Sequence, residues 1–263
     1  MRRSPISVRP MVQREAAASW PPPSRSECSM PPERPAPELP APQRHQLRRL
    51  TPAGWDRLLG QPWSEATRPC LAHWASHDLP LVVARQPGPS LDEHLHLGLP
   101  APACWARQRL RLQVARAELR GLDAFPPANA LAAQLPAEAG PAWQHLCDGL
   151  AALQLRAQVY GSHGWQHLTG LAYVHERSDL DLFIPVEHAQ AADAVTALLA
   201  GFGAAAPRLD GELGFADGSA VAWREWQDWR AGRVDQILVK RLHSVALESG
   251  TAWLGAATGS GRW

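Results

Sequence analysis

Hydrophobic residues recur at two spacings along this chain, and each spacing predicts a type of element. Between residues 141 and 153 they fall three and four positions apart, which is typical of a helix that packs one face on a core. The stretch from 192 to 202 repeats that spacing and ends among glycines. The apolar runs that end at Tyr160 and that follow Asp179 are short enough to be strands. Strands and helices are therefore predicted to alternate in this half of the chain.

Further strands are predicted on both sides of that stretch. Ahead of it, residues 79–84 form an apolar run and residues 108–114 alternate between apolar and polar. Behind it, Asp217-Gly218 is a strong turn dipeptide, which predicts a hairpin over 208–226. A last apolar run over 235–240 is predicted to close the sheet.

Composition divides the chain into four parts. Residues 1–43 are rich in proline and poor in large aliphatic residues, which predicts a disordered leader, with a proline-rich ligand or an over-extended start as alternatives. We expect a substrate-recognition domain over 44–126, a catalytic domain over 127–250 and a flexible tail over 251–263. The expected fold class is α+β, with a mixed sheet and flanking helices in the catalytic domain and a small α/β domain ahead of it.

Charge and cysteine content narrow the partners and the compartment. A net charge of +1 over 263 residues lacks the positive balance of a nucleic-acid groove, so no nucleic-acid polymer is an expected partner. No apolar stretch approaches the roughly 18 residues that span a bilayer, so no membrane is expected either. The cysteines form no Cys-x-x-Cys pair and are interpreted as small, buried or partly buried residues in a reducing compartment, the cytoplasm: Cys28, Cys70, Cys104 and Cys147.

Two carboxylates and a glycine-serine turn carry the candidate chemistry. Asp179 and Asp181 alternate with leucines, and because side chains alternate faces along a strand, both acids project to the same side. A divalent cation relieves their repulsion, and a few hard oxygen ligands favour Mg2+ with phosphate completing its shell. Gly161 and Ser162 follow a strand and open a helix, where backbone N–H groups can hold phosphate oxygens. Alone, the acidic run would equally suit a solvated edge strand.

Basic residues elsewhere are candidates for the phosphates of a substrate. Arg85 and Arg109, together with Arg107, carry guanidinium groups that suit phosphate, although a solvated strand face accounts for them as well. Lys240 or Arg241 would come near phosphates if residues 235–240 close the sheet.

Aromatic and histidine residues near these motifs have plainer alternatives. His163 and His167 lie beside the turn, and because Mg2+ prefers oxygen ligands they are interpreted as supporting or phosphate-facing groups. Three tryptophans at three-residue intervals could stack on an adenine, but core packing is the favoured interpretation: Trp223, Trp226 and Trp229.

The motifs together resemble a known superfamily and, within it, one family. A strand, a Gly-Ser turn, a helix and a paired-carboxylate strand resemble the core of polymerase-beta-like nucleotidyltransferases. The residues in and between these motifs are similar to those of the malonate decarboxylase holo-acyl-carrier-protein synthases, also called phosphoribosyl-dephospho-CoA transferases. The similarity covers about residues 44–248, in the runs Tyr160–Tyr173, Ser178–Leu182, Arg44–Leu47, Pro80–Gln86, Arg107–Leu110, Asp210–Glu212 and Ala222–Trp226.

The resemblance implies an activity and a third metal ligand. It implies transfer of a phosphoribosyl-dephospho-CoA group from triphosphoribosyl-dephospho-CoA to a serine of the apo acyl-carrier subunit of malonate decarboxylase, with pyrophosphate released and Mg2+ as cofactor. Superfamily members commonly place a third carboxylate on the strand after the second helix, for which Asp210 is preferred over Glu212 and Glu225. An ATP-dependent nucleotidyltransferase acting on a small molecule or protein, and a non-catalytic regulator of the same fold, stay open as alternatives.

Overall fold

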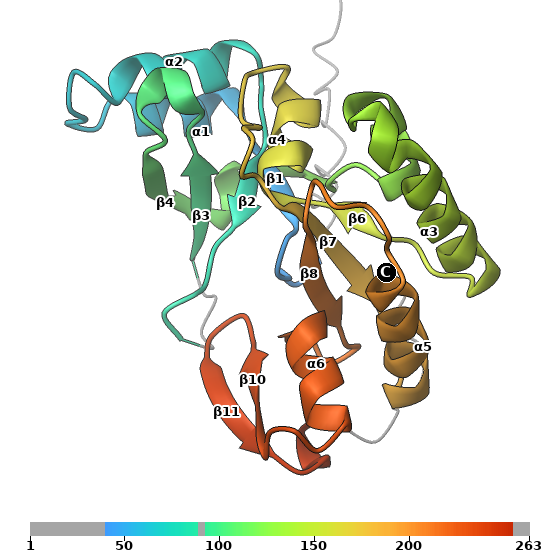
Figure 1. Cartoon of the computed structure of the whole chain (residues 1–263). Coiled ribbons are helices and arrows are strands. Elements are labelled where there is room, and N and C mark those ends of the chain that lie inside the picture. The colour runs from blue at the N-terminus through green and yellow to red at the C-terminus, as the bar shows by residue number, and fades with distance from the viewer. Residues whose placement is uncertain (1–39, 89–92, 255–263) are drawn as a thin grey trace, which may run out of the picture. The chain divides into compact units, whose positions relative to one another are not determined.

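The computed structural model describes residues 40–88 and 93–254, and these residues form two β-sheets with helices packed on them (Figure 1). A mixed α/β fold is confirmed. The predicted leader lies outside the described residues up to position 39, and so does the predicted tail beyond position 254.

The first sheet is antiparallel throughout, in the order β4-β3-β2-β1-β5. It carries the helices α1 (Pro52–Leu59) and α2 (Arg68–Ser76). The predicted strands at 79–84 and 108–114 are confirmed as β2 and β4. The strand bounds are β1 (Leu47–Leu50), β2 (Leu81–Val83), β3 (His94–Pro100), β4 (Arg109–Ala115) and β5 (Leu119–Asp123).

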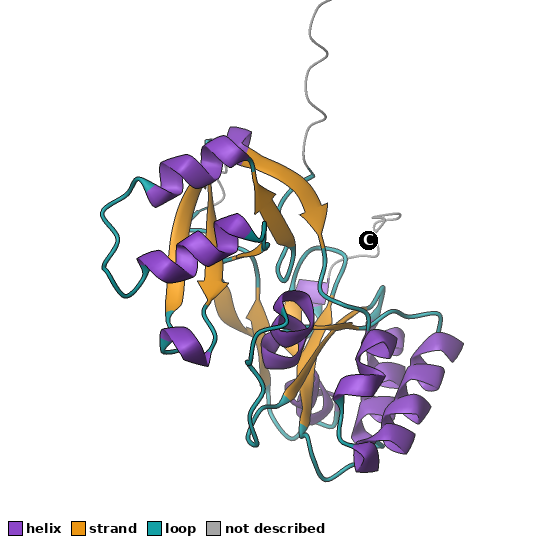
Figure 2. Ribbon diagram, turned by 90° about the horizontal axis from the view of Figure 1, so that it is seen from above, coloured by secondary structure: helices purple, strands orange, loops and turns teal. Residues whose placement is uncertain are grey.

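The second sheet is mixed, in the order β11-β10-β9-β8-β7-β6, with β7 parallel to β8 and the other neighbours antiparallel. Its strands are β6 (Gln158–Val159), β7 (Leu180–Pro185), β8 (Leu209–Gly214), β9 (Ala220–Ala222), β10 (Gln236–Lys240) and β11 (Val245–Ser249). Its helices are α3 (Gly140–Ala152), α4 (Gly161–Thr169), α5 (Ala189–Ala200) and α6 (Trp223–Arg230). Figure 2 shows the helices packed against the strands.

Short 3-10 helices join these elements at several places. They lie at Ala103–Trp105, Arg116–Glu118, Ala128–Gln134, Ala137–Ala139 and Ala252–Leu254. Helix α5 is the crossover between β7 and β8, and it lies beside α3 (Figure 1). A helical crossover is what a parallel strand pair requires.

Each sheet has its own hydrophobic core, and one helix belongs to the core of the other sheet. Phe125 packs in the first core and Ala128 packs in the second core, so the chain passes from the first core to the second between these two residues. Trp165 on α4 and Tyr173 after it pack in the first core, and the hydroxyl of Tyr173 donates to the Pro100 carbonyl at 2.7 Å. Helix α4, which follows β6, is therefore held by residues from both halves of the described chain.

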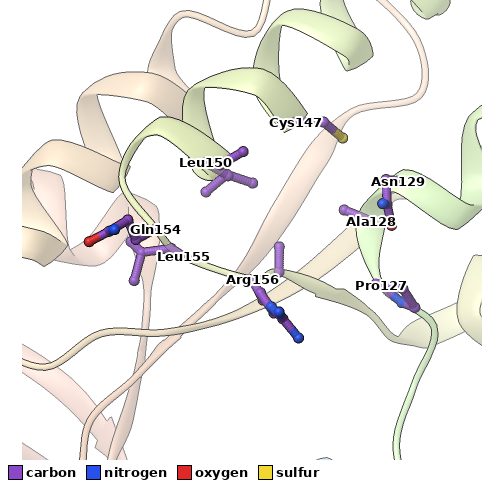
Figure 3. A pocket seen from close by; sticks show the side chains of 10 residues that line it. Pro127, Ala128, Asn129, Cys147, Leu150, Gln154, Leu155 and Arg156 are labelled. Carbon is purple, nitrogen blue, oxygen red and sulfur yellow. The ribbon is translucent and has the colours of Figure 1, made fainter.

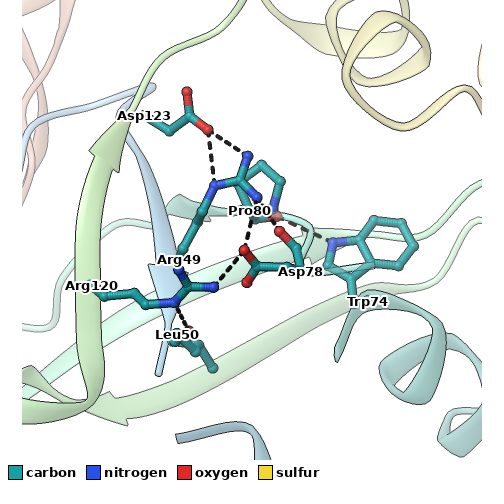
Figure 4. A network of polar contacts seen from close by, with 7 residues as sticks. All are labelled: Arg49, Leu50, Trp74, Asp78, Pro80, Arg120 and Asp123. Atoms are coloured by element: carbon teal, nitrogen blue, oxygen red, sulfur yellow. Dashed lines mark hydrogen bonds and ion pairs between the residues drawn. The ribbon is translucent and has the colours of Figure 1, made fainter. Parts of the chain in front are cut away.

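Ion pairs fix the β1–β5 edge of the first sheet (Figure 4). The guanidinium of Arg49 donates to Asp123 at 2.8 Å, and that of Arg120 pairs with Asp78 at 2.5 Å and donates to the Leu50 carbonyl at 2.8 Å. These groups are partly exposed, so each pair contributes about 1 kcal/mol at most. They link β1 and β5 to the loop before β2, and the residues just ahead of β1, Arg44 and His45, bind Glu212 in the second sheet.

The second strand of the predicted hairpin is shorter than predicted. The hairpin forms with Asp217-Gly218 in its turn, but its second strand ends at Ala222 and residues 223–230 continue as α6. Trp223 and Trp226 are buried in the second core, which confirms core packing for these two tryptophans. Three-residue spacing puts them on one face of a helix, and burying that face decides the conformation.

Of the cysteines that the structure describes, Cys70 is buried and Cys147 is partly buried, as predicted, whereas Cys104 is exposed on a short 3-10 helix, so the prediction of burial is wrong for that residue. Among the helices of the described residues, none has the length and apolar character needed to cross a membrane.

Candidate functional site

Two acidic residues face each other across the parallel strand pair. Asp181 on β7 is the register partner of Asp210 on β8, and partners on neighbouring strands point to the same face of a sheet. Asp179 lies just before β7, where the guanidinium of Arg208 donates to it at 3.0 and 2.7 Å. Arg208 also donates to Asp210 at 3.1 Å. The structure therefore brings together the three carboxylates predicted as metal ligands.

These carboxylates carry unequal charge. Burial, reinforced by the charges of Asp210, Asp179 and Glu212, raises the pKa of Asp181 to about 7. The hydrogen bond from Arg208 lowers the pKa of Asp179 below its usual value. Within the described residues the Asp181 side chain accepts no hydrogen bond, so its negative charge is left without a partner. An added cation at this position would be favoured electrostatically.

The predicted glycine-serine turn lies against Asp181. Gly161 has a φ of +63°, and a Cβ added there would overlap the Asp181 carboxylate and lie 2.9 Å from its Cγ. The Tyr160 N–H donates to the Asp181 carbonyl at 3.0 Å, which ties the turn to β7. Helix α4 begins at Gly161, so its first N–H groups lack partners inside the helix. The helix start, including Ser162, is therefore available to an anion beside the carboxylates.

The next acidic residue along β8 has a different environment. Glu212 is buried and accepts from Arg44 at 3.0 Å, His45 at 2.8 Å and Lys240 at 2.7 Å. Burial alone would raise the pKa of Glu212, but these three partners hold it well below its usual range. Its oxygens are already satisfied, which disfavours it as a metal ligand. Glu225 lies on α6 and accepts from the Leu238 N–H at 3.1 Å, so Asp210 is the third carboxylate that the geometry favours.

The two predicted phosphate-binding arginines lie apart from the carboxylates. Arg85 is exposed just after β2, and its carbonyl accepts from Arg111 at 3.1 Å. Arg109 is exposed at the start of the edge strand β4, opposite Pro100. None of the hydrogen bonds to the carboxylates in the described chain comes from either residue. Their role in phosphate binding stays a prediction.

The two histidines of α4 differ in their surroundings. His163 is 3% exposed, and neither of its ring nitrogens has a hydrogen-bond partner within the described residues. Burial lowers the pKa of His163, which keeps it neutral. His167 is paired instead with Gln134, whose amide lies 2.7 Å from its Nδ1.

Sequence reasoning missed three of the charged residues that complete the site. Arg44, His45 and Arg208 received no role, although Arg44 and His45 stand in one of the runs that carried the family resemblance. Lys240, which was expected near phosphates, donates to Glu212 at 2.7 Å, and its proximity to phosphates stays a prediction. Only the fold shows these partners, because Arg44 and His45 are 168 and 167 residues from Glu212 along the chain.

A cavity lies away from the carboxylates, beside β6 and the end of α3 (Figure 3). Its volume is about 570 Å³, and Cys147, Leu150, Asn129 and Arg156 are among its lining residues. None of the carboxylates lines it.

The residues present fit a magnesium ion held jointly with a substrate. In the described part of the chain, no group of three or more His, Cys, Asp or Glu side chains is already arranged around a metal position. Mg2+ is usually held by one or two carboxylates together with substrate phosphates, and Asp181 with Asp210 supplies such a pair. The unpartnered charge of Asp181 and the close approach that only glycine permits at Gly161 are consistent with that use.

Comparison with known proteins assigns the chain to a protein family. Residues 43–124 match the family model described as the phosphoribosyl-dephospho-CoA transferase MdcG N-terminal domain, and residues 118–251 match that of the C-terminal domain. These matches make the chain a transferase enzyme. It belongs to the phosphoribosyl-dephospho-CoA transferase family, as the sequence motifs indicated.

Curated relatives of the chain are named phosphoribosyl-dephospho-CoA transferases. A phosphoribosyl-dephospho-CoA transferase of Xanthomonas euvesicatoria pv. vesicatoria is 39% identical over 182 residues, which cover 68% of this chain and 84% of the relative. Another, of Bradyrhizobium diazoefficiens, is 36% identical over 221 residues, 83% of this chain and 95% of the relative. No solved structure matches the chain significantly, so the polymerase-beta-like core stays a prediction.

Proposed function

We propose that this enzyme transfers the phosphoribosyl-dephospho-CoA group from triphosphoribosyl-dephospho-CoA to a serine of the acyl-carrier subunit of malonate decarboxylase, and releases pyrophosphate. The observation that carries the proposal is the placement of Asp181 opposite Asp210, directly beside the Gly161 turn at the start of α4. Paired carboxylates beside an anion-binding helix start suit a reaction at a phosphate. The name of the family supplies the group that is transferred.

Different residues of the site would bind the phosphates and the metal ion. The first N–H groups of α4 and the Ser162 hydroxyl would hold the phosphates of the leaving pyrophosphate. Asp181 and Asp210 would hold Mg2+, with Asp179 as the further ligand. When bound, Mg2+ would neutralise the negative charge on the reacting and departing phosphates.

The choice of donor would depend on contacts away from the reacting phosphorus. Phosphate contacts are the same for ATP and for the larger donor, so the carboxylates and the turn cannot distinguish them. Arg85, just after β2, and Arg109, at the start of β4, are our candidates for binding the remote parts of the donor. Binding energy from such parts can orient the reacting group, so a donor that lacks them is expected to lose rate as well as affinity.

The test is the intact mass of the carrier protein after incubation with the enzyme, Mg2+ and each donor in turn. We expect the mass of the prosthetic group to be added from triphosphoribosyl-dephospho-CoA, on a serine and with stoichiometric pyrophosphate, and no adenylyl group from ATP. Asp181→Asn serves as the inactive control. An adenylyl increment from ATP at a comparable rate, with no prosthetic-group increment, would replace this proposal by the ATP-dependent alternative.

A further inference from the structure

The segment ahead of β1 places an imidazole beside the proposed reaction site. The Nε2–H of His45 donates to the Glu212 carboxylate at 2.8 Å, and its ring lies 4.2 Å from that of Tyr160 and 5.0 Å from that of Phe183. Tyr160 immediately precedes Gly161, and Phe183 is the register partner of Glu212 on β7. His45 therefore touches residues next to both the phosphate turn and the carboxylate strand.

The bond to Glu212 settles which ring nitrogen can accept a proton. An ionised carboxylate only accepts hydrogen bonds, so Nε2 carries a hydrogen, and in the neutral form of the ring Nδ1 is the nitrogen that keeps a lone pair. No residue in the described chain bonds Nδ1, and the side chain is 13% exposed. Arg44 and Lys240 hold Glu212 from other directions, so this carboxylate is fixed as the support of the ring.

The backbone at His45 limits what can replace this residue. Its φ is 60°, in the left-handed region that residues other than glycine rarely adopt, and Gln154 shares that conformation. A substitution at His45 must therefore tolerate a left-handed backbone.

The position along the strand suits a reacting hydroxyl. Glu212 lies two residues beyond Asp210 on the same face of β8, about 7 Å along the strand. The carboxylates themselves are engaged, because Arg208 binds Asp179 and Asp210, and all three are our proposed metal ligands. Among the described residues near the site, Asp181 and His45 both have an open acceptor atom, and His45 is the one that is not a proposed metal ligand.

We propose that His45, oriented by Glu212, accepts the proton of the attacking serine hydroxyl. This inference rests on the proposed function. The serine oxygen forms a bond to the donor's reacting phosphorus, the bond from that phosphorus to the pyrophosphate oxygen breaks, and its electron pair leaves with pyrophosphate. The serine proton moves to Nδ1 of His45 and then to solvent. The titratable groups in contact with the His45 ring are Glu212 and Tyr160, and the charged groups Arg44 and Lys240 bind the same Glu212 carboxylate.

Two substitutions separate this role from packing. His45→Gln keeps a side-chain donor for Glu212 but cannot take up a proton at neutral pH. His45→Gly suits the left-handed backbone and leaves space for added imidazole. Gln154→Gly is the matched control, because Gln154 also has a left-handed backbone, with φ 58°, and is exposed beside the remote cavity.

The measurement is the single-turnover rate of carrier modification at saturating donor and Mg2+, as a function of pH. The donor dissociation constant is measured separately by calorimetry. In His45→Gln we expect a rate about 100-fold or more below wild type, unchanged donor affinity, and loss of the wild-type plateau at high pH. Imidazole is expected to accelerate His45→Gly and to leave Gln154→Gly unaffected.

Failure of the inference and failure of the proposed function look different. A wild-type enzyme that adds no prosthetic group overturns the function, and the role of His45 with it. An active wild type whose rate and pH profile are retained in His45→Gln overturns the role of His45 alone. A loss confined to donor affinity, with the pH profile kept, overturns it as well and leaves His45 a packing residue.

Discussion

Substituting Gly161 by alanine tests whether the turn must lie against Asp181. Two effects are expected from the added methyl group. The first is backbone strain, because φ is +63° at Gly161, and a left-handed conformation costs a residue other than glycine about 1–2 kcal/mol. The second is overlap with the Asp181 carboxylate, which must rotate away from its place opposite Asp210.

Gly170 separates these two effects within the same helix. It ends α4 with a φ of +69°, and an added Cβ there would meet nothing within 4 Å. Gly170→Ala therefore carries the backbone strain without the overlap. For a chain of this size, 1–2 kcal/mol corresponds to a fall in melting temperature of about 2–8 °C.

The assay is carrier modification followed by intact mass, together with thermal unfolding of both variants. Gly170→Ala is expected to lose stability by that amount and to keep its turnover. Gly161→Ala is expected to lose about 100-fold or more in turnover in addition, the scale on which the loss of one electrostatic contribution acts. Equal turnover in the two variants would refute the placement of the turn against a catalytic carboxylate.

Three further perturbations follow from the charges and the composition. The pKa of Asp181 is raised to about 7 in the folded protein, above the value near 3.9 of the unfolded chain. The metal-free folded protein therefore binds this proton more tightly than the unfolded chain does. As a result, it loses stability as the pH rises from about 4 to about 7. Asp181→Asn should therefore raise the melting temperature at pH 8 and not at pH 4, and Mg2+ with donor should stabilise only the wild type; no gain at pH 8 would contradict this. Glu212→Gln removes the charge that three basic side chains share. In a urea titration it should lower the free energy of unfolding by on the order of 3 kcal/mol. A loss of less than about 1 kcal/mol would show that this buried charge contributes little to stability. Deleting residues 1–39 should change neither melting temperature nor turnover, because a proline-rich segment with few large aliphatic residues adds little to a core; a clear drop in either would overturn that view.

The features that could be predicted from the sequence depend on local geometry. Alternation along one strand put Asp179 and Asp181 together, whereas Asp210 was proposed from the resemblance to the superfamily, whose members commonly place a third carboxylate on the strand after the second helix. The structure adds that Asp181 and Asp210 are register partners. Registers between strands depend on packing across the sheet, which no single segment encodes.

The features that sequence reasoning missed depend on contacts between distant segments. Nothing near Glu212 in the sequence indicates that Arg44 and His45 will bind it. Trp165 could not be assigned to the first core from its place on a helix that follows β6. Residues 223–226 were misread as strand because an apolar and polar mixture over so few positions suits both periods, and burial of Trp226 decided in favour of the helix.

The bonds of Arg44 and His45 to Glu212 also limit how this chain can recombine. A crossover near residues 118–124, where the two family models overlap, would join the first sheet of one relative to the second sheet of another. The carboxylate would then be inherited from one parent and two of its basic partners from the other. A chimaera is expected to fold stably only when the incoming half supplies an equivalent pair at positions 44 and 45. The two halves are thus expected to be exchanged in evolution as a matched set, and grafting a new N-terminal half onto this enzyme requires grafting that pair with it.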